Sequence, residues 1–472
     1  MFILVSCFVS LGNWRRGIFL IIIAGALQDP IRKITPGTPG YLVLSIVPIF
    51  MSMIVGGLMR NTRFWSGFRK TFKQLSKTIG LFMISLVPGA LISLTYGFGG
   101  LQLIMMGVLS YWIFIVGWQT GFIINRNYGE MRKILSFYCM VTAIMLIGTP
   151  LEYFGLVPDS LLIGTKALEM DWIRYTGEDV ISLIAGFYRS PDIMGWHAVA
   201  AGILATVLAM ASRGGRRYAW VAVAAWCLAA AMLCGRRKMV LMFPIFCIVL
   251  LWLYLRMRHS GRAIRALGVV AIVIIIGFSF YDFFGSSEAR ETYYFRQMGQ
   301  IPERVKAHGI DSVIGTFEQS GFFGEGIGMA ATGAHHLDVE RPNVWQEGGL
   351  DRLMVELGVP GLVCFIILVV VLARTILKLV LTQANPKSEE FIFTAGLSSF
   401  FFANAGSFIV SHQIFGDPYI LTFFSILTGF ILSAARTQQP TADFVPSRKG
   451  LQIKHGQIPA WQKGIPIHKR RV

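Results

Sequence analysis

The chain has 472 residues, of which 54% are hydrophobic and only 14% are charged, and its mean hydropathy is +0.60. A soluble domain does not carry so much apolar surface with so few charges, so this composition excludes a water-soluble globular protein. The formal net charge of +18 suggests nucleic acid as a partner, but the way the charges are distributed along the chain argues against it.

Apolar runs of about twenty residues recur along the chain, and each is long enough to cross a hydrocarbon core about 30 Å thick. They predict an all-α polytopic membrane protein in which residues 1–435 form a single membrane domain within the lipid bilayer. The six cysteines lie in apolar stretches without metal-ligand spacing, so we expect small buried thiols rather than disulfides. About twelve transmembrane helices are predicted, the first of them short, at 17–31, 41–59, 79–96, 99–123, 134–154, 196–212, 218–235, 239–256, 265–283, 352–379, 391–411 and 417–435.

The short loops that are rich in Lys and Arg set the orientation. The first three of them alternate with less basic loops and are therefore predicted on the cytoplasmic side. The tail 436–472 carries eight Lys/Arg against one Asp, and we expect a disordered cytoplasmic tail that is attracted to anionic lipid. These basic segments are therefore interpreted as membrane anchors, and a nucleic-acid partner is the much weaker interpretation of the positive charge. The basic loops are 60–78, 126–133, 213–217 and 256–265.

The acidic residues are concentrated elsewhere. Residues 152–195 carry seven Asp/Glu and residues 282–351 carry eleven, which together make 18 of the 25 acids in the chain. The topology predicts two long outer loops at about 155–195 and 284–351. Loops of this length exceed what is needed to connect two spans and are usually functional. We therefore expect the active region on the outer, periplasmic-type face.

The first outer loop ends in "GFYRSPDIMGWHAVAAG", from Gly186 to Gly202. Arg189 comes just before Ser190 and Pro191, and proline is favoured in the first turn of a helix. The start of a helix presents unpaired N–H groups and the positive end of the helix dipole, so an arginine beside it favours an anion site. An ordinary interfacial loop with aromatic anchors is the alternative interpretation.

The hairpin "MLCGRRKMVLMF", from Met232 to Phe243, places three cations between two apolar runs. The predicted topology puts Arg236, Arg237 and Lys238 on the outer face, against the positive-inside trend. A cation at the bilayer centre costs about 2.5–3.5 kcal/mol, so we expect the triplet at the interface or in a water-filled cavity. A turn whose side chains snorkel to lipid phosphate explains the pattern equally well.

The second outer loop ends in "GFFGEGIGMAATGAHHLDVERPNVWQEGGLDRLMVELGVPGLVCF". Its glycines predict a flexible loop that closes over a site rather than a nucleotide site, since no strand precedes them and no Lys-Ser/Thr follows. Glu347 lies between aromatic and apolar residues, where a carboxylate has raised proton affinity and can act as a general base. On the residue alone, one more solvated acid in an acidic loop is the favoured interpretation. His335 and His336 lack partner ligands at metal-site spacing, so we expect no metal.

These three motifs, in this order and topology, resemble the bacterial O-antigen ligase and polysaccharide polymerase superfamily. The resemblance covers most of the chain and rests on "YRSPDIMGWHA", "CGRRKMV" and "EGGLDRLMVELGVPGL". It implies a metal-independent glycosyltransferase without cofactors, located in the bacterial inner membrane with its active face in the periplasm. Such enzymes transfer or polymerise glycan from an undecaprenyl-diphosphate-linked oligosaccharide onto the hydroxyl of a glycan or lipid acceptor.

By this resemblance Arg189, together with Arg236 or Arg237, holds the diphosphate of the donor. Guanidinium groups bind phosphate oxygens bidentately and would stabilise charge on the departing lipid diphosphate without a metal. Many members of the family, ligases especially, carry a histidine nine residues before the glutamate of an "E-x-G-x-x-G" stretch. Here Glu347 lies nine residues before Glu356. Glu347 is therefore the implied catalytic base, and the change from histidine favours a polymerase slightly over a ligase.

Two other functions remain as alternatives. A polysaccharide transporter or flippase has a similar number of spans, but it is expected to show broken helices and charged residues near mid-membrane. A non-catalytic component of an exopolysaccharide assembly complex does not need outward-facing arginines. The glycosyltransferase hypothesis predicts that Arg189, Arg237 and Glu347 line one outer cavity that opens sideways to lipid.

Overall fold

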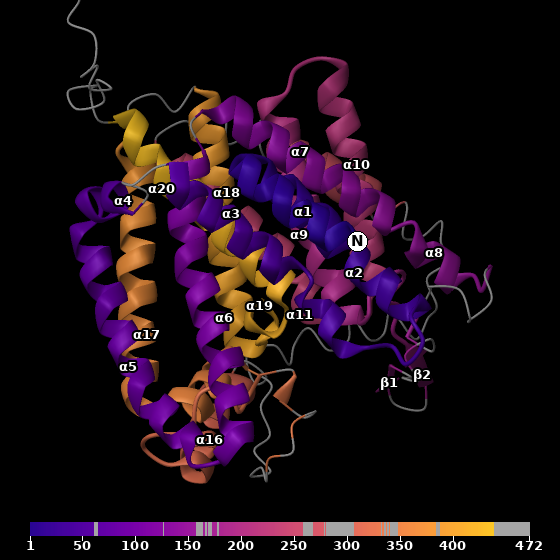
Figure 1. Cartoon of the computed structure of the whole chain (residues 1–472). Coiled ribbons are helices and arrows are strands. Elements are labelled where there is room, and N and C mark those ends of the chain that lie inside the picture. The colour runs from indigo at the N-terminus through magenta and orange to yellow at the C-terminus, as the bar shows by residue number, and fades with distance from the viewer. Residues whose placement is uncertain are drawn as a thin grey trace, which may run out of the picture.

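The computed structural model describes most of the chain up to residue 438 and shows a bundle of helices with a small antiparallel hairpin (Figure 1). The apolar runs form helices because lipid offers no partner for backbone N–H and C=O groups, which must then bond within their own segment. The described residues are 1–438 apart from 61–64, 126, 157–163, 166–167, 169–171, 177–178, 258–267, 278, 280–305, 332, 335–336, 338, 340–347 and 384–387.

The elements follow one another along the chain in two groups, separated by the hairpin. Before it come α1 (Phe2–Gly12), η1 (Trp14–Arg16), α2 (Gly17–Ile34), η2 (Gly40–Leu44), α3 (Ile46–Arg60), α4 (Ser66–Thr71), α5 (Lys73–Leu94), α6 (Gly97–Ile124), α7 (Tyr128–Met145) and α8 (Gly148–Tyr153). The hairpin pairs β1 (Ile173–Thr176) with β2 (Asp179–Ser182). After it come α9 (Pro191–Ala211), α10 (Gly215–Leu233), α11 (Arg237–Val240), α12 (Met242–Arg256), η5 (Ala307–Asp311), α16 (Ser312–Ser320), α17 (Gly349–Leu381), α18 (Glu389–Val410), α19 (Gln413–Gly416) and α20 (Pro418–Gln438).

The all-α membrane fold is confirmed. Nine helical segments in the described part of the chain are long and apolar enough to cross a membrane, and each coincides with a predicted span. The predicted span 17–31 forms α2, which carries Asp29, and 218–235 forms α10, which begins with two arginines. The span 265–283 contains an apolar helix at Gly268–Gly277 and lies partly outside the described residues. About twelve helices therefore remains the prediction for the whole chain.

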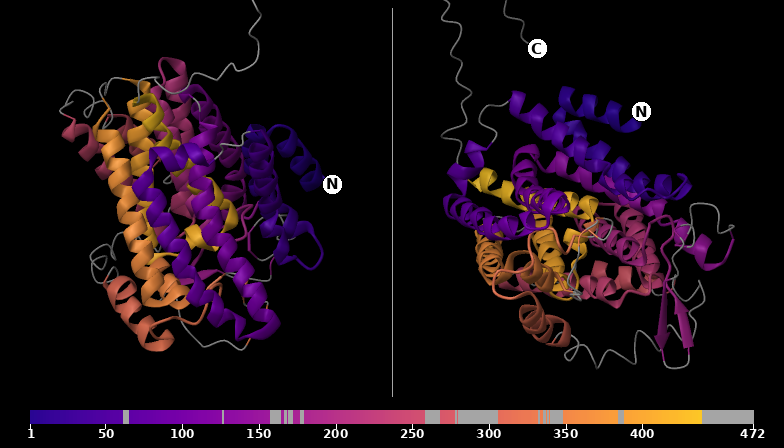
Figure 2. Two further views of the ribbon diagram at one scale, coloured as in Figure 1. Left: turned by 60° about the vertical axis from the view of Figure 1, so that its left-hand side comes forward. Right: turned by 60° about the horizontal axis from the view of Figure 1, so that its bottom comes forward.

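The centre of the bundle is formed by α9 and α20, whose membrane segments are each 94% buried, while α5 has only 33% of its segment buried and faces outward. The axis of α20 lies very close to that of α6, because glycine leaves room for a neighbouring backbone. A methyl group on Gly121 would come within 2.1 Å of the carbonyl oxygen of Ile426. Small residues bring membrane helices together in this way. Figure 2 shows α1–α3 packed on one flank of this centre.

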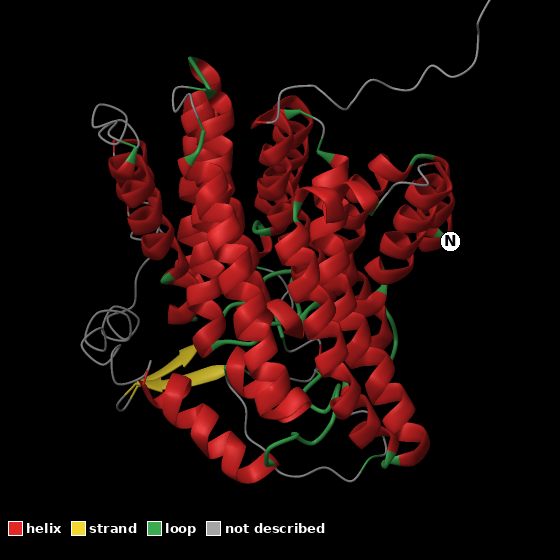
Figure 3. Ribbon diagram, turned by 90° about the vertical axis from the view of Figure 1, so that its left-hand side faces the viewer, coloured by secondary structure: helices red, strands yellow, loops and turns green. Residues whose placement is uncertain are grey.

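The described parts of the predicted basic loops lie at one end of the bundle. Arg436 donates a hydrogen bond of 2.7 Å to the carbonyl of Asn125, and Arg132 donates one of 2.8 Å to the carbonyl of Ala211. Arg132 also pairs with Glu389 at 2.8 Å. We call this the basic end. In Figure 1 it lies at the top with α4, while α16 and the hairpin lie toward the bottom on opposite sides, and Figure 3 shows the hairpin again toward the lower end of the bundle.

The opposite end carries the described parts of the two acid-rich loops, and we call it the acidic end. The segregation of basic and acidic loops to opposite ends follows the predicted topology, in which every loop alternates between two sides. Which of the two ends faces the periplasm stays a prediction from the positive-inside rule.

The helix α17 is broken where it meets the glycine-rich segment 321–328. Gly358 has φ +63° and ψ −166°, and a methyl group there would come within 2.3 Å of the carbonyl oxygen of Phe322. That carbonyl accepts a hydrogen bond of 2.9 Å from the N–H of Val359, and the carbonyl of Val355 accepts one of 2.7 Å from Glu325. The segment thus supplies the backbone partners that the interrupted helix lacks.

The same segment is also attached to α5. The N–H of Ile327 bonds the carbonyl of Gly89 at 3.0 Å, and the Ser93 hydroxyl donates to the Ile327 carbonyl at 2.9 Å. The expectation of a flexible loop closing over a site is therefore wrong for residues 321–328. They form a wedge fixed between α5, α6 and α17, because interrupted backbone inside a membrane bundle must find partners there.

Candidate functional site

Arg189 lies in a tightly held segment at the start of α9. The Ser190 hydroxyl caps the helix by accepting from the N–H of Ile193 at 3.4 Å. One carboxylate oxygen of Glu152 accepts hydrogen bonds from the N–H groups of Ala185 at 2.9 Å and Gly186 at 2.6 Å. These contacts fix the backbone that presents Arg189.

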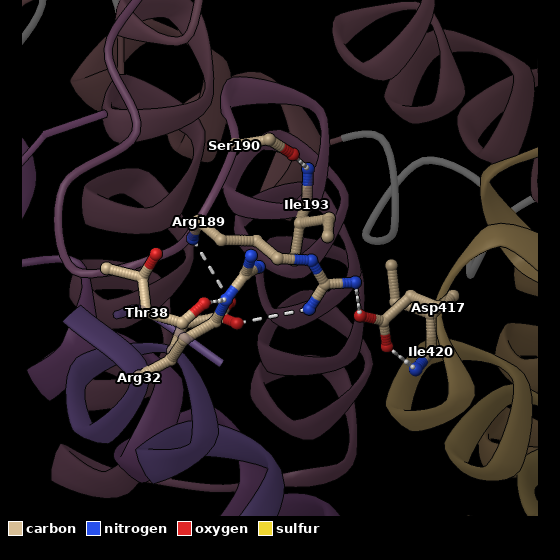
Figure 4. A network of polar contacts seen from close by, with 8 residues as sticks. Arg32, Thr38, Arg189, Ser190, Ile193, Asp417 and Ile420 are labelled. Carbon is tan, nitrogen blue, oxygen red and sulfur yellow. Dashed lines mark hydrogen bonds and ion pairs between the residues drawn. The ribbon is translucent and has the colours of Figure 1, made fainter. Parts of the chain in front are cut away.

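The guanidinium of Arg189 is enclosed by two carboxylates that sequence reasoning did not identify. It bonds Asp29 of α2 at 3.0 Å, and the Arg189 backbone N–H bonds the other oxygen of Asp29 at 3.1 Å. Its other terminal nitrogen pairs with Asp417, just before α20 (Figure 4). Asp417 in turn caps α20 by accepting from the N–H of Ile420 at 2.8 Å. Arg189 therefore joins α2, α9 and α20.

This cluster of Asp29, Arg189 and Asp417 carries two negative charges and one positive charge. All three side chains are buried, with 1%, 8% and 0% exposure. Burial alone lowers the pKa of Arg189, but the carboxylates of Asp417 and Asp29 outweigh it and raise the pKa above its ordinary value. Because both terminal nitrogens of the guanidinium are already bonded to carboxylates, the arrangement suits a structural junction better than the capture of a further anion.

Lys33 stands beside this cluster and is 8% exposed. Its ammonium donates a hydrogen bond of 2.9 Å to the carbonyl of Gly186. Burial lowers the pKa of Lys33 to about 8, although Asp29 and Glu152 act in the opposite direction. In the folded protein the amine therefore loses its proton well below the pKa of an exposed lysine.

We expect Lys33 to make the folding stability of the protein vary with pH in the alkaline range. Its pKa is depressed in the folded state, so between about pH 8 and the unfolded value near 10.5 the unfolded state binds more protons and stability rises with pH. Thermal unfolding of the wild type and of Lys33→Met, compared from pH 7 to 10.5, checks this. Between about pH 8 and 10.5, the melting temperature of the wild type should rise relative to that of the variant. A constant difference would contradict the assignment.

The cationic triplet lies at the same end of the bundle and shares one carboxylate. Asp192, in the first turn of α9, forms an ion pair with Nε of Arg236 at 2.8 Å through one carboxylate oxygen and with Nζ of Lys238 at 3.1 Å through the other. The guanidinium of Arg236 also lies over the ring of Trp172, 4.9 Å from its centre. The backbone carbonyl of Trp172 accepts a hydrogen bond of 2.8 Å from the N–H of Leu183, the residue that follows β2. Two cations to one carboxylate leave this group with a net positive charge.

The two predicted arginine sites are thus brought to one region but differ in character. Arg189 and Asp192 are three residues apart at the start of α9, so the Arg189 cluster and the triplet flank the same helix terminus. Arg236 is buried with 6% exposure, while the Lys238 side chain is 29% exposed and Arg237 is half-buried. Of the two sites, the triplet is the one whose charge suits an anionic ligand.

A third charged group lies deeper in the bundle, on the part of α17 that precedes its break. Arg352 pairs through Nε with Glu356 at 3.1 Å, and the Tyr111 hydroxyl of α6 donates to the other oxygen of Glu356 at 2.6 Å. Their exposures are 1%, 0% and 0%. Asp351 accepts from the N–H of Gly348 at 3.0 Å and from a serine hydroxyl at 2.7 Å, which fixes the start of the helix.

Several predicted residues fall outside the described residues. These are Glu347, the implied base, and the histidine pair His335 and His336. The predicted common cavity of Arg189, Arg237 and Glu347 is therefore untested. In the described part of the chain, no group of three His, Cys, Asp or Glu side chains is placed to hold a metal ion.

The carboxylates that organise the site left only a faint signal in the sequence. Asp29 interrupts an apolar stretch, and Asp417 lies at the start of the last predicted span. An acid in such a position is expensive and needs a cation. That rule predicts a partner for each but does not identify Arg189, which lies 160 residues from Asp29 and 228 from Asp417. No protein-family model matches the chain, and no curated protein matches it.

Proposed function

We propose that the protein is a membrane glycosyltransferase that takes glycan from an undecaprenyl-diphosphate carrier. The observation that carries the proposal is the cationic triplet at the acidic end, where Arg236 and Lys238 share the single carboxylate of Asp192. An arginine fork with surplus positive charge near a membrane interface suits the diphosphate of a lipid carrier. The aromatic ring of Trp172 on one face of Arg236 holds the guanidinium in a fixed plane.

The proposed chemistry requires no metal. The acceptor hydroxyl attacks the anomeric carbon of the donor, the bond from that carbon to the phosphate oxygen breaks, and undecaprenyl diphosphate leaves with the bonding electrons. Arg236, Arg237 and Lys238 stabilise the charge that develops on the leaving diphosphate. Glu347 is the proposed base that accepts the hydroxyl proton, on sequence grounds alone. Chain extension, as by a polymerase, is favoured over ligation, and we place the reaction at the periplasmic face of a bacterial inner membrane.

Arg189 has a different part in this proposal. Its cation is bound by Asp29 and Asp417, so we assign it to positioning the start of α9 and, through Asp192, the triplet. This revises the expectation that Arg189 itself grips the diphosphate.

A polysaccharide transporter is the second candidate, and specific observations favour it. The helix α17 is broken at Gly358, and the ion pair of Arg352 and Glu356 is buried inside the bundle. Broken helices and internal charges are features of transporters.

The leaflet in which donor accumulates distinguishes these two functions. In a deletion strain lacking a glycosyltransferase, lipid-linked oligosaccharide should build up in the outer leaflet, where a membrane-impermeant lectin or periodate reaches it in spheroplasts. Loss of a flippase should leave it in the inner leaflet, protected until the cells are lysed. Re-expression of the wild-type chain should reverse the accumulation and restore the polymer. Inner-leaflet accumulation would refute the glycosyltransferase proposal, and unchanged lipid-linked glycan would refute both.

A further inference from the structure

Arg352 is a buried cation with unused donors. Its side chain is 1% exposed, and its only described ion-pair partner is Glu356, bound at Nε at 3.1 Å. The two terminal nitrogens, Nη1 and Nη2, make no hydrogen bond of good geometry among the residues that the structure describes. Buried donors are normally paired, and an unpaired guanidinium end is especially costly.

The polar side chains next to Arg352 are already hydrogen-bonded to each other. Glu356 accepts from Nε of Arg352 on one oxygen and from the Tyr111 hydroxyl on the other. The Tyr111 hydroxyl also lies within hydrogen-bonding reach of the Arg352 side chain, and it can accept from at most one of the two terminal nitrogens. The remaining identified contact is the ring of Phe415, whose centre is 5.8 Å from the guanidinium carbon. Glu356 therefore orients the fork from the Nε side and leaves its terminal edge for another group.

The position of this group within the bundle adds a second argument. Tyr111 lies midway along α6 (Gly97–Ile124), so the charges lie between helices rather than at the surface. Phe415 is in α19, two residues before Asp417, which binds Arg189. The Arg352 group and the Arg189 cluster are thus connected through one short segment. Ionisable residues inside a membrane bundle mark functional sites by default.

We propose that Nη1 and Nη2 of Arg352 bind an oxyanion of the substrate, either a phosphate or a sugar carboxylate. A guanidinium edge with two free nitrogens matches the two oxygens of such a group. Arg352 lies in the first turn of α17, where the helix dipole adds positive potential. This site is separate from the triplet. The proposal applies whether the protein is a glycosyltransferase or a transporter.

Anion-dependent stabilisation of the purified full-length protein tests this site. Thermal unfolding in detergent is followed by tryptophan fluorescence across a titration of sodium pyrophosphate or of sodium glucuronate, with sodium chloride at matched ionic strength as the reference. One of the two anions should raise the melting temperature of the wild type saturably. Arg352→Gln should lose this rise, and Arg69→Gln, an exposed change at the basic end, should keep it. A rise with pyrophosphate identifies a phosphate ligand, and one with glucuronate identifies a sugar carboxylate.

Two further variants keep the result interpretable. Arg352→Lys retains a cation opposite Glu356 but lacks the planar fork, so it should fold and bind the anion at least about tenfold more weakly. Arg236→Gln reports on the triplet. If the rise depends on Arg236 and not on Arg352, the inference is overturned and the anion site of the proposed function stands. If the rise is lost only in the Arg352 variants, the inference stands whatever the activity of the protein. A stabilisation that is identical in wild type and Arg352→Lys also overturns it.

Discussion

The Arg189→Ala variant is expected to lose about 3–5 kcal/mol of unfolding free energy. The substitution leaves Asp29 and Asp417 as two buried carboxylates without their cation, and breaking a buried pair by removing one partner has this cost. It also removes the link between α2, α9 and α20. Equilibrium unfolding of purified protein in mixed micelles measures the loss, and the amount of protein in the membrane should fall with it.

The matched control is Arg174→Ala, which removes an exposed arginine from β1 at the same end of the bundle. Its free energy of unfolding should stay within about 0.5 kcal/mol of the wild type. Combining Arg189→Gln with Asp29→Asn and Asp417→Asn removes all three charges and should recover part of the lost stability. An Arg189→Ala protein as stable as the control would show that Arg189 is not the junction described here.

This result bears on how the function is tested. Loss of product in an Arg189 variant is expected from the stability defect alone, so it carries no information about diphosphate binding. Diphosphate binding is better tested at an arginine whose acidic partner keeps another cation after the substitution.

Arg236→Ala meets this condition and should lower glycan transfer by about 10²-fold or more while the fold persists. Asp192 keeps Lys238 as a cation after the substitution, so no buried carboxylate is stranded. The expected loss corresponds to the removal of one group that stabilises charge on a leaving oxygen. Release of polyprenyl diphosphate from a lipid-linked oligosaccharide, measured with purified protein, gives the rate.

Arg216→Ala supplies the control for this measurement. Arg216 is an exposed arginine at the start of α10, at the basic end of the bundle. The other end of α10 leads into the triplet. It should leave turnover unchanged. Arg236→Lys should retain part of the activity, because charge remains but the fork is lost. Normal turnover in Arg236→Ala with an intact fold would exclude the triplet from catalysis.

The membrane fold could be predicted because its determinants are local. Each span is a continuous apolar run, and the requirement that backbone groups bond internally turns such a run into a helix without reference to the rest of the chain. The nine long apolar helices accordingly fall on predicted spans. The break at Gly358 was not predicted, because it depends on a segment about thirty residues upstream that enters the helix from the side.

The candidate site could be predicted only in part, because its contacts are not local. Arg189 was predicted from the helix start that follows it, and Arg236 from its place on the unexpected side of the membrane. Their partners Asp29, Asp417 and Asp192 lie on other helices or on a helix start, and a single acid in an apolar stretch does not reveal which cation it meets. Arg352 appeared to be part of a family-like stretch, and only its burial with unpaired nitrogens distinguishes it.

The wedge at residues 321–328 also has a consequence for how the protein is made. The ribosome synthesises this segment before α17, yet the N–H of Val359 and the carbonyl of Val355, which flank Gly358, have their partners in the wedge. If the wedge were carried away from the membrane before α17 arrived, those groups would enter lipid unpaired, at a cost of several kcal/mol each. Insertion of α17 should therefore be coupled to retention of the preceding loop beside α5, so these parts of the nascent chain assemble as one unit.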